Sequence, residues 1–470
     1  MKIAPDENKE SWQDAMSLMK TLALIFLSIG LSVSKLAAQN SVDAAAIDSY
    51  LNPYVQSGNF AGDVLIEKNG SVIFEKAYGF ADREKGARNS SATRFHIASV
   101  SMQFTAAAIL RLVDKGSISL STQVSEVVPG ITGGDKITIR DLLMERSGLP
   151  DINDLPDYGD VLEHHQTPAS LIAKIKGHPL LFKPGSKFLH EEHSAYNLLA
   201  LIVEKKIGLP FAAAMKKLVF QPGGLSRSGI DDDAIPVTPD GAKGYEPDGV
   251  YGLKAATPIH WSAKTGNASV VTTAGDEARW VHALFGDRLL KAASLEAILD
   301  TSQKVGYGWF RGMNPRYHET VYYTNGRAPG YASFVLYLPR EQTSVVVFSN
   351  IYSSATTTIG YDMAAIALGL PYERFQPSEP APTAEQIKTC TGKFRFGPDF
   401  YQANADVALV ANGPELSLRW PSSDVSPLIP LGRDRFMDRS YWEEVRIERD
   451  AEGGPKALVY GRFRGEVVGK

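Results

Sequence analysis

Residues 95–116 read FHIASVSMQFTAAAILRLVDKG, and this stretch decides the fold because it combines a helical pattern with a serine near its start. Apolar side chains recur at intervals of three and four residues, at Ala106, Ile109, Leu110 and Val113. That spacing predicts an amphipathic helix, and Gly116 stands where a helix commonly ends. Ser99 and Met102 are three residues apart, so we expect both side chains on one face of the helix, one turn apart.

The composition is that of an ordinary globular protein. The chain has 470 residues, of which 44% are hydrophobic and 22% are charged, and its formal net charge is -4 at pH 7. This length accommodates one large domain and a smaller one, and the interspersed charges form no basic patch for nucleic acid. We therefore expect a small-molecule or peptide-like ligand, no nucleic acid and no cofactor. The single cysteine, Cys390, excludes an intramolecular disulfide, and its sequence neighbours favour a buried structural thiol.

The first 38 residues are predicted to be a leader that contains a secretory signal peptide. An apolar or small-residue run of about 13 residues occupies positions 21–33, and Ala37-Ala38-Gln39 offers a small-residue cleavage site. The run is shorter than the roughly 20 residues that span a bilayer, so we expect no stable membrane span. Residues 1–15 are polar and charged, which favours Met16 or Met19 as the true start. We expect an exported protein, either periplasmic or secreted.

Two strand-rich regions enclose a helical middle region between residues 42 and 370. Residues 62–82 give two β-rich runs around Asn69-Gly70, a strong hairpin signal, and residues 331–350 give two more. Residues 355–370 are typical of a closing helix. We predict an α+β domain over residues 42–370, in which one antiparallel sheet forms from both ends of the domain and packs against helices.

A second, smaller domain is predicted at the C-terminal side. Residues 371–382 contain four prolines and are typical of a linker. Residues 383–470 alternate short strand-like runs with turns. This pattern predicts a small all-β domain, either a β-meander or a barrel.

Four further stretches carry a resemblance to a known family. They are ITIRDLLMERSGLPD (137–151), KPGSKF (183–188), AYNLLALIVEKKIG (195–208) and NGRAPGYASFVLYLP (325–339). With residues 95–116 they follow the order found in the β-lactamase-related serine hydrolases, the group that contains class C β-lactamases, penicillin-binding DD-peptidases and esterases of the same fold. The resemblance implies a β-lactamase/transpeptidase-like fold over residues 42–370 and acyl transfer through a serine nucleophile.

Three short motifs surround the reacting serine in that family. An S-x-x-K helix supplies the nucleophile and a lysine base, a Y-x-N loop supplies a phenol and an amide, and a K-T-G or H-x-G strand supplies a hydrogen-bonding edge and part of the oxyanion hole. The resemblance places Ser99 at the nucleophile position and Met102 at the lysine position. A thioether has no basic nitrogen, so Met102 cannot accept the serine proton and is expected to be a packing residue.

The second motif has no tyrosine. Counting back from the helical stretch 195–208 aligns the motif tyrosine with Glu191 and the motif asparagine with His193. Counting forward from KPGSKF gives His190 and Glu192 instead, which implies one inserted residue.

The third motif aligns with Thr324-Asn325-Gly326, which retains the glycine and lacks the cation. Thr324 and Gly326 are thus the candidate strand residues. A second segment, Lys264-Thr265-Gly266, spells K-T-G, but its sequence context resembles a loop and helix upstream of that strand. We expect the segment to be a loop rather than a catalytic element.

The cluster His190-Glu191-Glu192-His193 admits three interpretations. It can be a polar turn that lines the pocket or faces solvent. It can supply a replacement base, with His193 or His190 reaching Ser99 and a glutamate orienting the imidazole. It can also ligate a metal, because histidines and carboxylates are common ligand types.

Two functional hypotheses follow for the hydrolase-like domain. The first is an exported homologue that binds a peptidoglycan-like, peptide or ester ligand and is catalytically impaired, because all three activating partners of the serine are missing. The second is an active serine hydrolase of the β-lactamase, DD-peptidase or esterase type that uses Ser99 with a base from residues 190–193. A third possibility is a scaffold that acts through residues 383–470.

Overall fold

The computed structural model describes residues 42–190, 192–232, 240–286, 289–378 and 380–468. The predicted leader, residues 1–38, lies outside this part, as does Glu191 of the second motif. From Ala44 onward the chain forms one compact unit.

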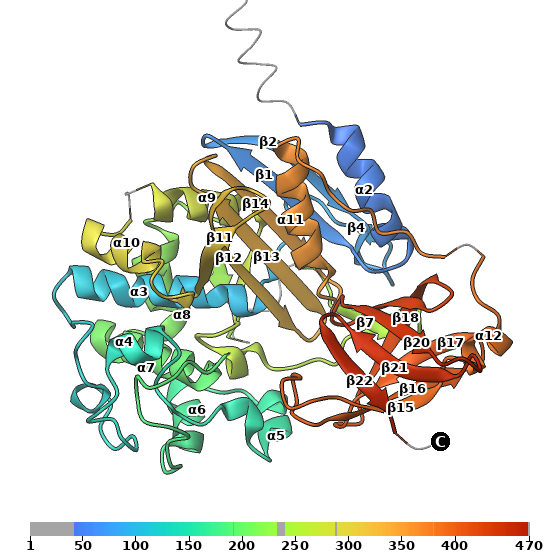
Figure 1. Cartoon of the computed structure of the whole chain (residues 1–470). Coiled ribbons are helices and arrows are strands. Elements are labelled where there is room, and N and C mark those ends of the chain that lie inside the picture. Colours follow the sequence, from blue (N-terminus) through green and yellow to red (C-terminus); the bar gives the residue numbers. More distant parts are fainter. Residues whose placement is uncertain (1–41, 191, 233–239, 287–288, 379, 469–470) are drawn as a thin grey trace, which may run out of the picture. The chain divides into compact units, whose positions relative to one another are not determined.

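An antiparallel sheet in the order β10-β11-β12-β13-β14-β1-β2 forms the centre of the first domain (Figure 1). Its strands are β1 (Gly62–Lys68), β2 (Ser71–Tyr78), β10 (Val305–Gly306), β11 (Trp309–Asn314), β12 (Glu319–Ala328), β13 (Tyr331–Leu338) and β14 (Thr343–Ser349). The β1–β2 turn places Asn69 and Gly70 at φ 51° and 74°, the left-handed region that a tight hairpin requires. Strand β1 pairs with β14, so the two ends of the domain meet in adjacent strands. This confirms the predicted α+β architecture.

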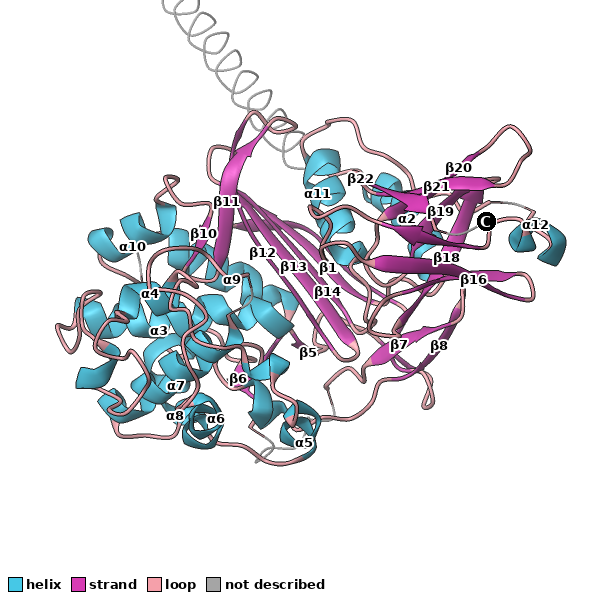
Figure 2. Ribbon diagram, turned by 60° about the horizontal axis from the view of Figure 1, so that its bottom comes forward, coloured by secondary structure: helices cyan, strands magenta, loops and turns pink. Residues whose placement is uncertain are grey.

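Helices cover both faces of the central sheet (Figure 2). Helix α2 (Ala44–Gln56) packs on α11 (Ala355–Ala367), which contacts β1, β13 and β14. Helix α9 (Ala274–Phe285) packs on β1 and β14 from the other side. Strand β14 is buried along its whole length because it has a helix on each face.

The helical middle region is arranged around α3 (Met102–Asp114). Ten of its side chains are buried, and it contacts α7, α8 and α10. The other elements of the region are α4 (Ile139–Leu143), α5 (Tyr158–Glu163), α6 (Pro168–Ile175), α7 (His193–Ile207), α8 (Phe211–Met215), α10 (Ala292–Leu299), η1 (Ala98–Ser101), η2 (Val124–Glu126), η3 (Ile152–Asp154), η4 (Lys216–Phe220) and η5 (Trp261–Lys264). One apolar core joins these helices to the sheet.

Three small sheets accompany the central sheet. Their strands are β3 (Phe80–Asp82) with β4 (Ala87–Arg88), β5 (Phe95–His96) with β9 (Val270–Thr272) and β6 (Gly229–Ile230), and β7 (Tyr245–Asp248) with β8 (Gly252–Ala255). Strand β5 leads directly into η1, so it fixes the start of the helix that carries Ser99.

The C-terminal domain is a closed barrel, the second of the two predicted forms. Helix α12 (Ala384–Lys388) precedes the strands β15 (Gly392–Arg395), β16 (Asp406–Asn412), β17 (Glu415–Arg419), β18 (Val425–Gly432), β19 (Arg435–Asp438), β20 (Glu444–Arg449), β21 (Pro455–Tyr460) and β22 (Phe463–Val467). Pairing of β15 with β22 closes the barrel. Strand β18 is the least expected from the sequence because it contains Pro427 and Pro430. The pairing register with β19 shifts after Pro430, which is the kind of irregularity that tolerates a missing N–H.

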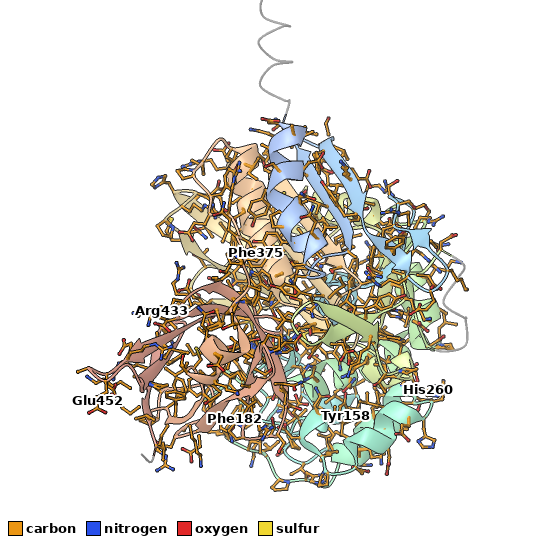
Figure 3. All side chains as sticks on the ribbon, turned by 90° about the vertical axis from the view of Figure 1, so that its right-hand side faces the viewer. Tyr158, Phe182, His260, Phe375, Arg433 and Glu452 are labelled. Atoms are coloured by element: carbon orange, nitrogen blue, oxygen red, sulfur yellow. The ribbon has the colours of Figure 1, made fainter. Side chains whose placement is uncertain are left out.

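A loop of the barrel, residues 438–442, anchors it to the first domain; we call it the docking loop. Its Arg439 is fully buried and donates hydrogen bonds of 2.6–2.9 Å to Gly58 O, Asn59 Oδ1, Gly249 O and Gly252 O. Trp442 packs against Tyr54 of α2 and against Phe375, which is labelled in Figure 3. The barrel is therefore joined to the first domain by a satisfied buried cation and an aromatic cluster.

Candidate active site

Ser99 lies in the short helix η1, immediately before α3. The preceding residue, Ala98, is fully buried at φ 49°, a left-handed backbone conformation that is uncommon for alanine. The Ser99 side chain is half-buried, while its neighbours Ala98 and Val100 are buried. The backbone thus leaves Ser99 partly exposed between buried neighbours, just before the central helix.

Gly326 of β12 lies against the backbone of Ser99. A Cβ atom at position 326 would be 2.6 Å from Ser99 N and 2.7 Å from Ile97 O, which is closer than side-chain atoms can approach. Ser333, which faces Gly326 across the β12–β13 pairing, donates its hydroxyl to Ile97 O at 2.5 Å. The structure therefore brings together two of the sequence-predicted residues, Ser99 and Gly326.

The C-terminal half of β12 presents a strand edge beside Ser99. Strand β11 pairs with residues 319–323 only, whereas β13 pairs with β12 as far as Ala328. Within the described residues, positions 324–328 have no strand on their outer side. An unpaired edge exposes backbone N–H and C=O groups that an extended ligand can bind.

The backbone N–H of Ser99 is also available at this edge. The first N–H groups of a helix have no acceptor within the helix, and among the described residues no backbone acceptor for Ser99 N is found. Ser99 N and the adjacent edge of β12 can therefore bind an oxygen atom of a ligand, as an oxyanion hole does.

Met102 occupies the position one turn after Ser99 and belongs to the apolar core. Its side chain is 5% exposed, and the backbone at Met102 and Gln103 is closely covered by Gly308. Ser99 Oγ makes no hydrogen bond with any other residue of the described part of the chain. Met102 therefore contributes apolar packing, and the Ser99 hydroxyl is without a hydrogen bond to the described residues.

Glu192 is a buried residue at the start of α7. Its carboxylate accepts hydrogen bonds from the Ser147 hydroxyl at 2.7 Å and from the Ser147 backbone N–H at 3.1 Å. Burial raises the pKa of Glu192 to about 7, and the hydrogen bonds from Ser147 oppose that rise. Glu192 thus ties α7 to the loop that follows α4.

His193 forms a local network with Asp151 and Asn153. Its Nδ1 lies 2.9 Å from Asp151 Oδ2 and 3.0 Å from Asn153 Nδ2. Burial raises the pKa of Asp151, but the hydrogen bond and charge of His193 outweigh that effect, so the pKa lies below its usual value. His190 is exposed and its ring lies 5.9 Å from that of Phe310 on β11. The two histidines of the cluster therefore have separate surroundings.

Thr324 and the K-T-G segment also have defined positions. Thr324 is 2% exposed on β12, and the next residue, Asn325, is exposed. Lys264 ends η5 and its amine hydrogen-bonds the hydroxyl of Tyr158 on α5, which is labelled in Figure 3. Lys264 thus lies at the end of a short helix, which a turn at Thr265-Gly266 follows, and not in a strand.

Two features of the site are not indicated by the sequence alone: the partners of His193 and the contacts of the residue after Gly326. Asp151 is the last residue of the stretch ITIRDLLMERSGLPD, which carries part of the family resemblance. Arg327 follows the third motif directly and contacts the docking loop. The described residues include no group of three or more His, Cys, Asp or Glu side chains that could hold a metal ion.

Comparison with known proteins identifies the family. The sequence profile of the Beta-lactamase family matches residues 47–367. The chain belongs to this family. The confirmed assignment covers the domain that carries Ser99, Gly326 and the central sheet.

Individual proteins are also similar to this chain. PbpX of Bacillus subtilis (strain 168) is named as a penicillin-binding protein. It is 28% identical to this chain over 307 residues, and the match covers 65% of this chain and 74% of the length of PbpX. Protein flp of Staphylococcus aureus (strain MRSA252) is 26% identical over 327 residues, and the match spans only 63% of its length.

A solved structure matches more of the chain. The octameric penicillin-binding protein homologue from Pyrococcus abyssi has a TM-score of 0.63 at 22% identity and covers 90% of this chain and 99% of its own. At this identity the match concerns the fold. In the described part of the chain, no helix is long and apolar enough to cross a membrane.

Proposed function

We propose that this member of the Beta-lactamase family is an exported protein that binds a peptidoglycan-like, peptide or ester ligand beside Ser99 and turns it over poorly. The proposal rests on the surroundings of the Ser99 hydroxyl. Its Oγ atom has no hydrogen-bond partner among the described residues, and the buried residue Met102 stands one turn further along the helix. A serine hydroxyl needs a neighbouring base to lose its proton during attack on a carbonyl.

The contacts of two other residues of the candidate motifs support this proposal. Glu192 is engaged by Ser147, and Lys264 is engaged by Tyr158. The features that remain suit binding: the Ser99 N–H, the close approach of Gly326 and the unpaired edge of β12. Ligand binding along this edge needs no proton transfer, so it can persist where acylation is slow.

Turnover and binding can be measured separately. Purified protein is incubated with chromogenic esters and with a fluorescent penicillin, and Ser99→Ala is run in parallel. We expect ester hydrolysis close to that of Ser99→Ala and reversible ligand binding in both proteins. Steady hydrolysis that depends on Ser99 would overturn the proposed impairment, and absence of reversible binding by the wild type would overturn the proposed binding role.

One observation favours a second candidate function, an active serine hydrolase with a replacement base. The contact between His193 Nδ1 and Asp151 resembles the orienting contact of a Ser-His-acid arrangement, in which the other ring nitrogen takes the serine proton. This candidate predicts hydrolysis that disappears in both His193→Ala and Ser99→Ala. Loss of hydrolysis in Ser99→Ala alone would contradict it.

A further inference from the structure

The connections between the barrel strands gather at two opposite ends of the C-terminal domain. Its eight strands pair in chain order, so successive connections alternate between the ends. The end that carries the docking loop, which we call the barrel mouth, is formed by residues 396–405, 420–424, 439–443 and 461–462. The connections of the opposite end are residues 413–414, 433–434 and 450–454, and they contain no aromatic residue. The two ends of the barrel therefore differ in chemistry.

Aromatic rings from all four connections meet at the barrel mouth. Tyr401 belongs to the first connection, Trp420 begins the second, Tyr441 belongs to the third, and Phe463 directly follows the fourth. The ring centres of Trp420 and Tyr441 are 5.5 Å apart, and those of Tyr401 and Phe463 are 5.0 Å apart. The buried ring of Tyr460 joins the two pairs, at 5.4 Å from Trp420 and 6.2 Å from Tyr401. The rings thus form one cluster.

The outer rings of this cluster are exposed although they are firmly supported. Tyr401 is 70% exposed and Tyr441 is 47% exposed. Trp420 is half-buried, and its indole N–H donates to Ser426 Oγ at 3.0 Å. The ring of Phe400, which is buried, lies nearly parallel to that of Trp420, at 11°. A rigid aromatic surface left in water is typical of a place where a ligand or partner binds.

Polar side chains stand between these rings. The exposed polar residues of the first two connections are Asp399, Gln402, Asn404, Ser422, Ser423 and Asp424. In the third connection, Glu443 is half-buried, and a side chain at Gly461 would collide with its carboxylate. The Glu443 carboxylate therefore lies against the turn between β21 and β22. It has no hydrogen bond or ion pair with any residue of the described part of the chain, so its oxygens can accept hydrogen bonds from a ligand.

The charges at the barrel mouth disfavour an anionic ligand. Asp399, Asp424 and Glu443 are acidic, whereas Arg462 is the exposed base of the four connections and lies over the ring of Phe463 at 4.8 Å. An excess of carboxylates repels a polyanion such as a nucleic acid. Carboxylates accept strong hydrogen bonds from neutral O–H and N–H donors. The ligand that fits is neutral, has apolar faces and carries many donors at its rim.

We propose that the barrel mouth is a binding site for a neutral saccharide. A pyranose ring presents C–H groups on its faces and hydroxyl groups around its rim. The C–H groups pack on the negative face of an aromatic ring such as Tyr401 or Trp420. The hydroxyl groups donate to Glu443 and to the polar side chains between the rings. Mouths of β-barrels are also common places for small-molecule sites.

The barrel mouth borders the domain that carries Ser99. The ring centre of Tyr441 lies 4.3 Å from the guanidinium carbon of Arg327 on β12, and Arg327 donates to Ser440 O at 2.6 Å. A saccharide at the mouth is therefore held beside the hydrolase-like domain. Binding there is an activity of the C-terminal domain and does not require a reacting group at Ser99.

The test titrates the full chain with tri-N-acetylchitotriose, with cellotriose and with the tripeptide trialanine, and follows binding by isothermal titration calorimetry. We expect the wild type to bind the trisaccharides and not the peptide. Tyr401→Ala and Trp420→Ala should each weaken binding about tenfold, as loss of one stacked ring gives. Tyr401→Phe retains the ring and should retain most of the affinity. Glu443→Gln should also weaken binding, because it removes a charged acceptor.

Controls separate this site from misfolding and from the events at Ser99. Arg433→Met alters an exposed residue at the opposite end of the barrel, labelled in Figure 3, and should bind as the wild type does. Binding of one trisaccharide alone supports the site and shows whether the acetamido groups are recognised. Absence of binding by both trisaccharides, full affinity in both alanine variants, or tighter binding of trialanine would overturn the proposal. No ester or penicillin is present, so these outcomes are independent of the hydrolysis and acylation assays.

Thermal unfolding of each variant completes the test. Because Tyr401 is mostly exposed, Tyr401→Ala should unfold at the temperature of the wild type. Loss of saccharide binding in a variant that unfolds normally supports a direct contact between the ring and the ligand.

Discussion

Gly326 touches the backbone of Ser99 so closely that no side chain fits between them. A Cβ at residue 326 would lie 2.6 Å from Ser99 N and 2.9 Å from Val100 N. This contact is the point where the antiparallel sheet meets the central helix. It keeps the serine N–H beside the unpaired edge of β12, whichever reaction the site performs.

Gly326→Ala should therefore damage both stability and ligand binding. The added methyl group forces the strand away from η1, and overpacking of this kind costs about 1–3 kcal/mol. Thermal unfolding and ligand titration measure the two effects. Gly312→Ala on β11 is the matched control, because a Cβ there meets nothing within 4 Å. Equal ligand affinity in the two variants would contradict the proposed role of the Gly326 contact.

Met102→Lys should increase the rate at which Ser99 is acylated. A lysine amine one turn from Ser99 supplies a proton acceptor, and general-base assistance is worth about 10²–10⁴-fold in rate. We expect a gain of about tenfold, less than that range, because the tyrosine and the strand cation of the other two motifs are still missing. Met102→Leu, which preserves the apolar packing, should stay at the wild-type rate. An unchanged rate in Met102→Lys, with the fold intact, would show that the missing base is not what limits Ser99.

Glu277 should make the stability of the protein fall as pH rises. It is fully buried on α9, and burial raises its pKa to about 8, opposed by the hydrogen bond from Gln103 Nε2 at 2.7 Å. The folded protein then holds a proton that the unfolded chain has released, so stability declines between the ordinary glutamate pKa and about 8. The slope from this group is at most about 1.4 kcal/mol per pH unit.

Glu277→Gln should remove that component of the slope. Denaturant unfolding of both proteins from pH 5 to pH 9 measures it, and Glu296→Gln on the exposed face of α10 is the control. As pH rises, the free energy of unfolding of Glu277→Gln should exceed that of the wild type by a growing amount. A constant difference across this range would mean that Glu277 ionises normally in the folded protein.

Arg439→Met should loosen the barrel from the first domain. The substitution leaves the acceptors at Gly58, Asn59, Gly249 and Gly252 without their donor, and loss of such a buried network costs at least about 3 kcal/mol. We expect a separate unfolding transition for the barrel and faster protease cleavage in residues 371–382. Arg433→Met, at an exposed barrel position labelled in Figure 3, should behave as the wild type. Unchanged cooperative unfolding of Arg439→Met would contradict the anchoring role.

The fold was predictable because its signals are local. The Asn69-Gly70 turn, the helical spacing after Ser99 and the prolines of residues 371–382 each act within a few residues. Closure of the barrel was harder to predict from the sequence, because it depends on the pairing of β15 with β22 at opposite ends of the domain. The sequence did not indicate strand β18, because the strand contains two prolines.

Only those residues of the candidate site that belong to short sequence motifs could be predicted. Ser99, Met102 and Gly326 follow from short motifs, and the structure places Ser99 and Gly326 together. The pairing of His193 with Asp151 and the stacking of Arg327 on Tyr441 join residues distant in the sequence. Such contacts depend on how helices and domains pack, so neither residue spacing nor composition indicates them.

Acylation of Ser99 tests the central claim most directly. Intact-mass spectrometry follows the full chain during incubation with a penicillin, with Ser99→Ala and Met102→Lys beside it. We predict that, early in the reaction, the wild type forms at most about a tenth of the covalent adduct that Met102→Lys forms in the same time. Rapid, stoichiometric acylation of the wild type, absent in Ser99→Ala, would contradict the account of a serine that has lost its activating partners.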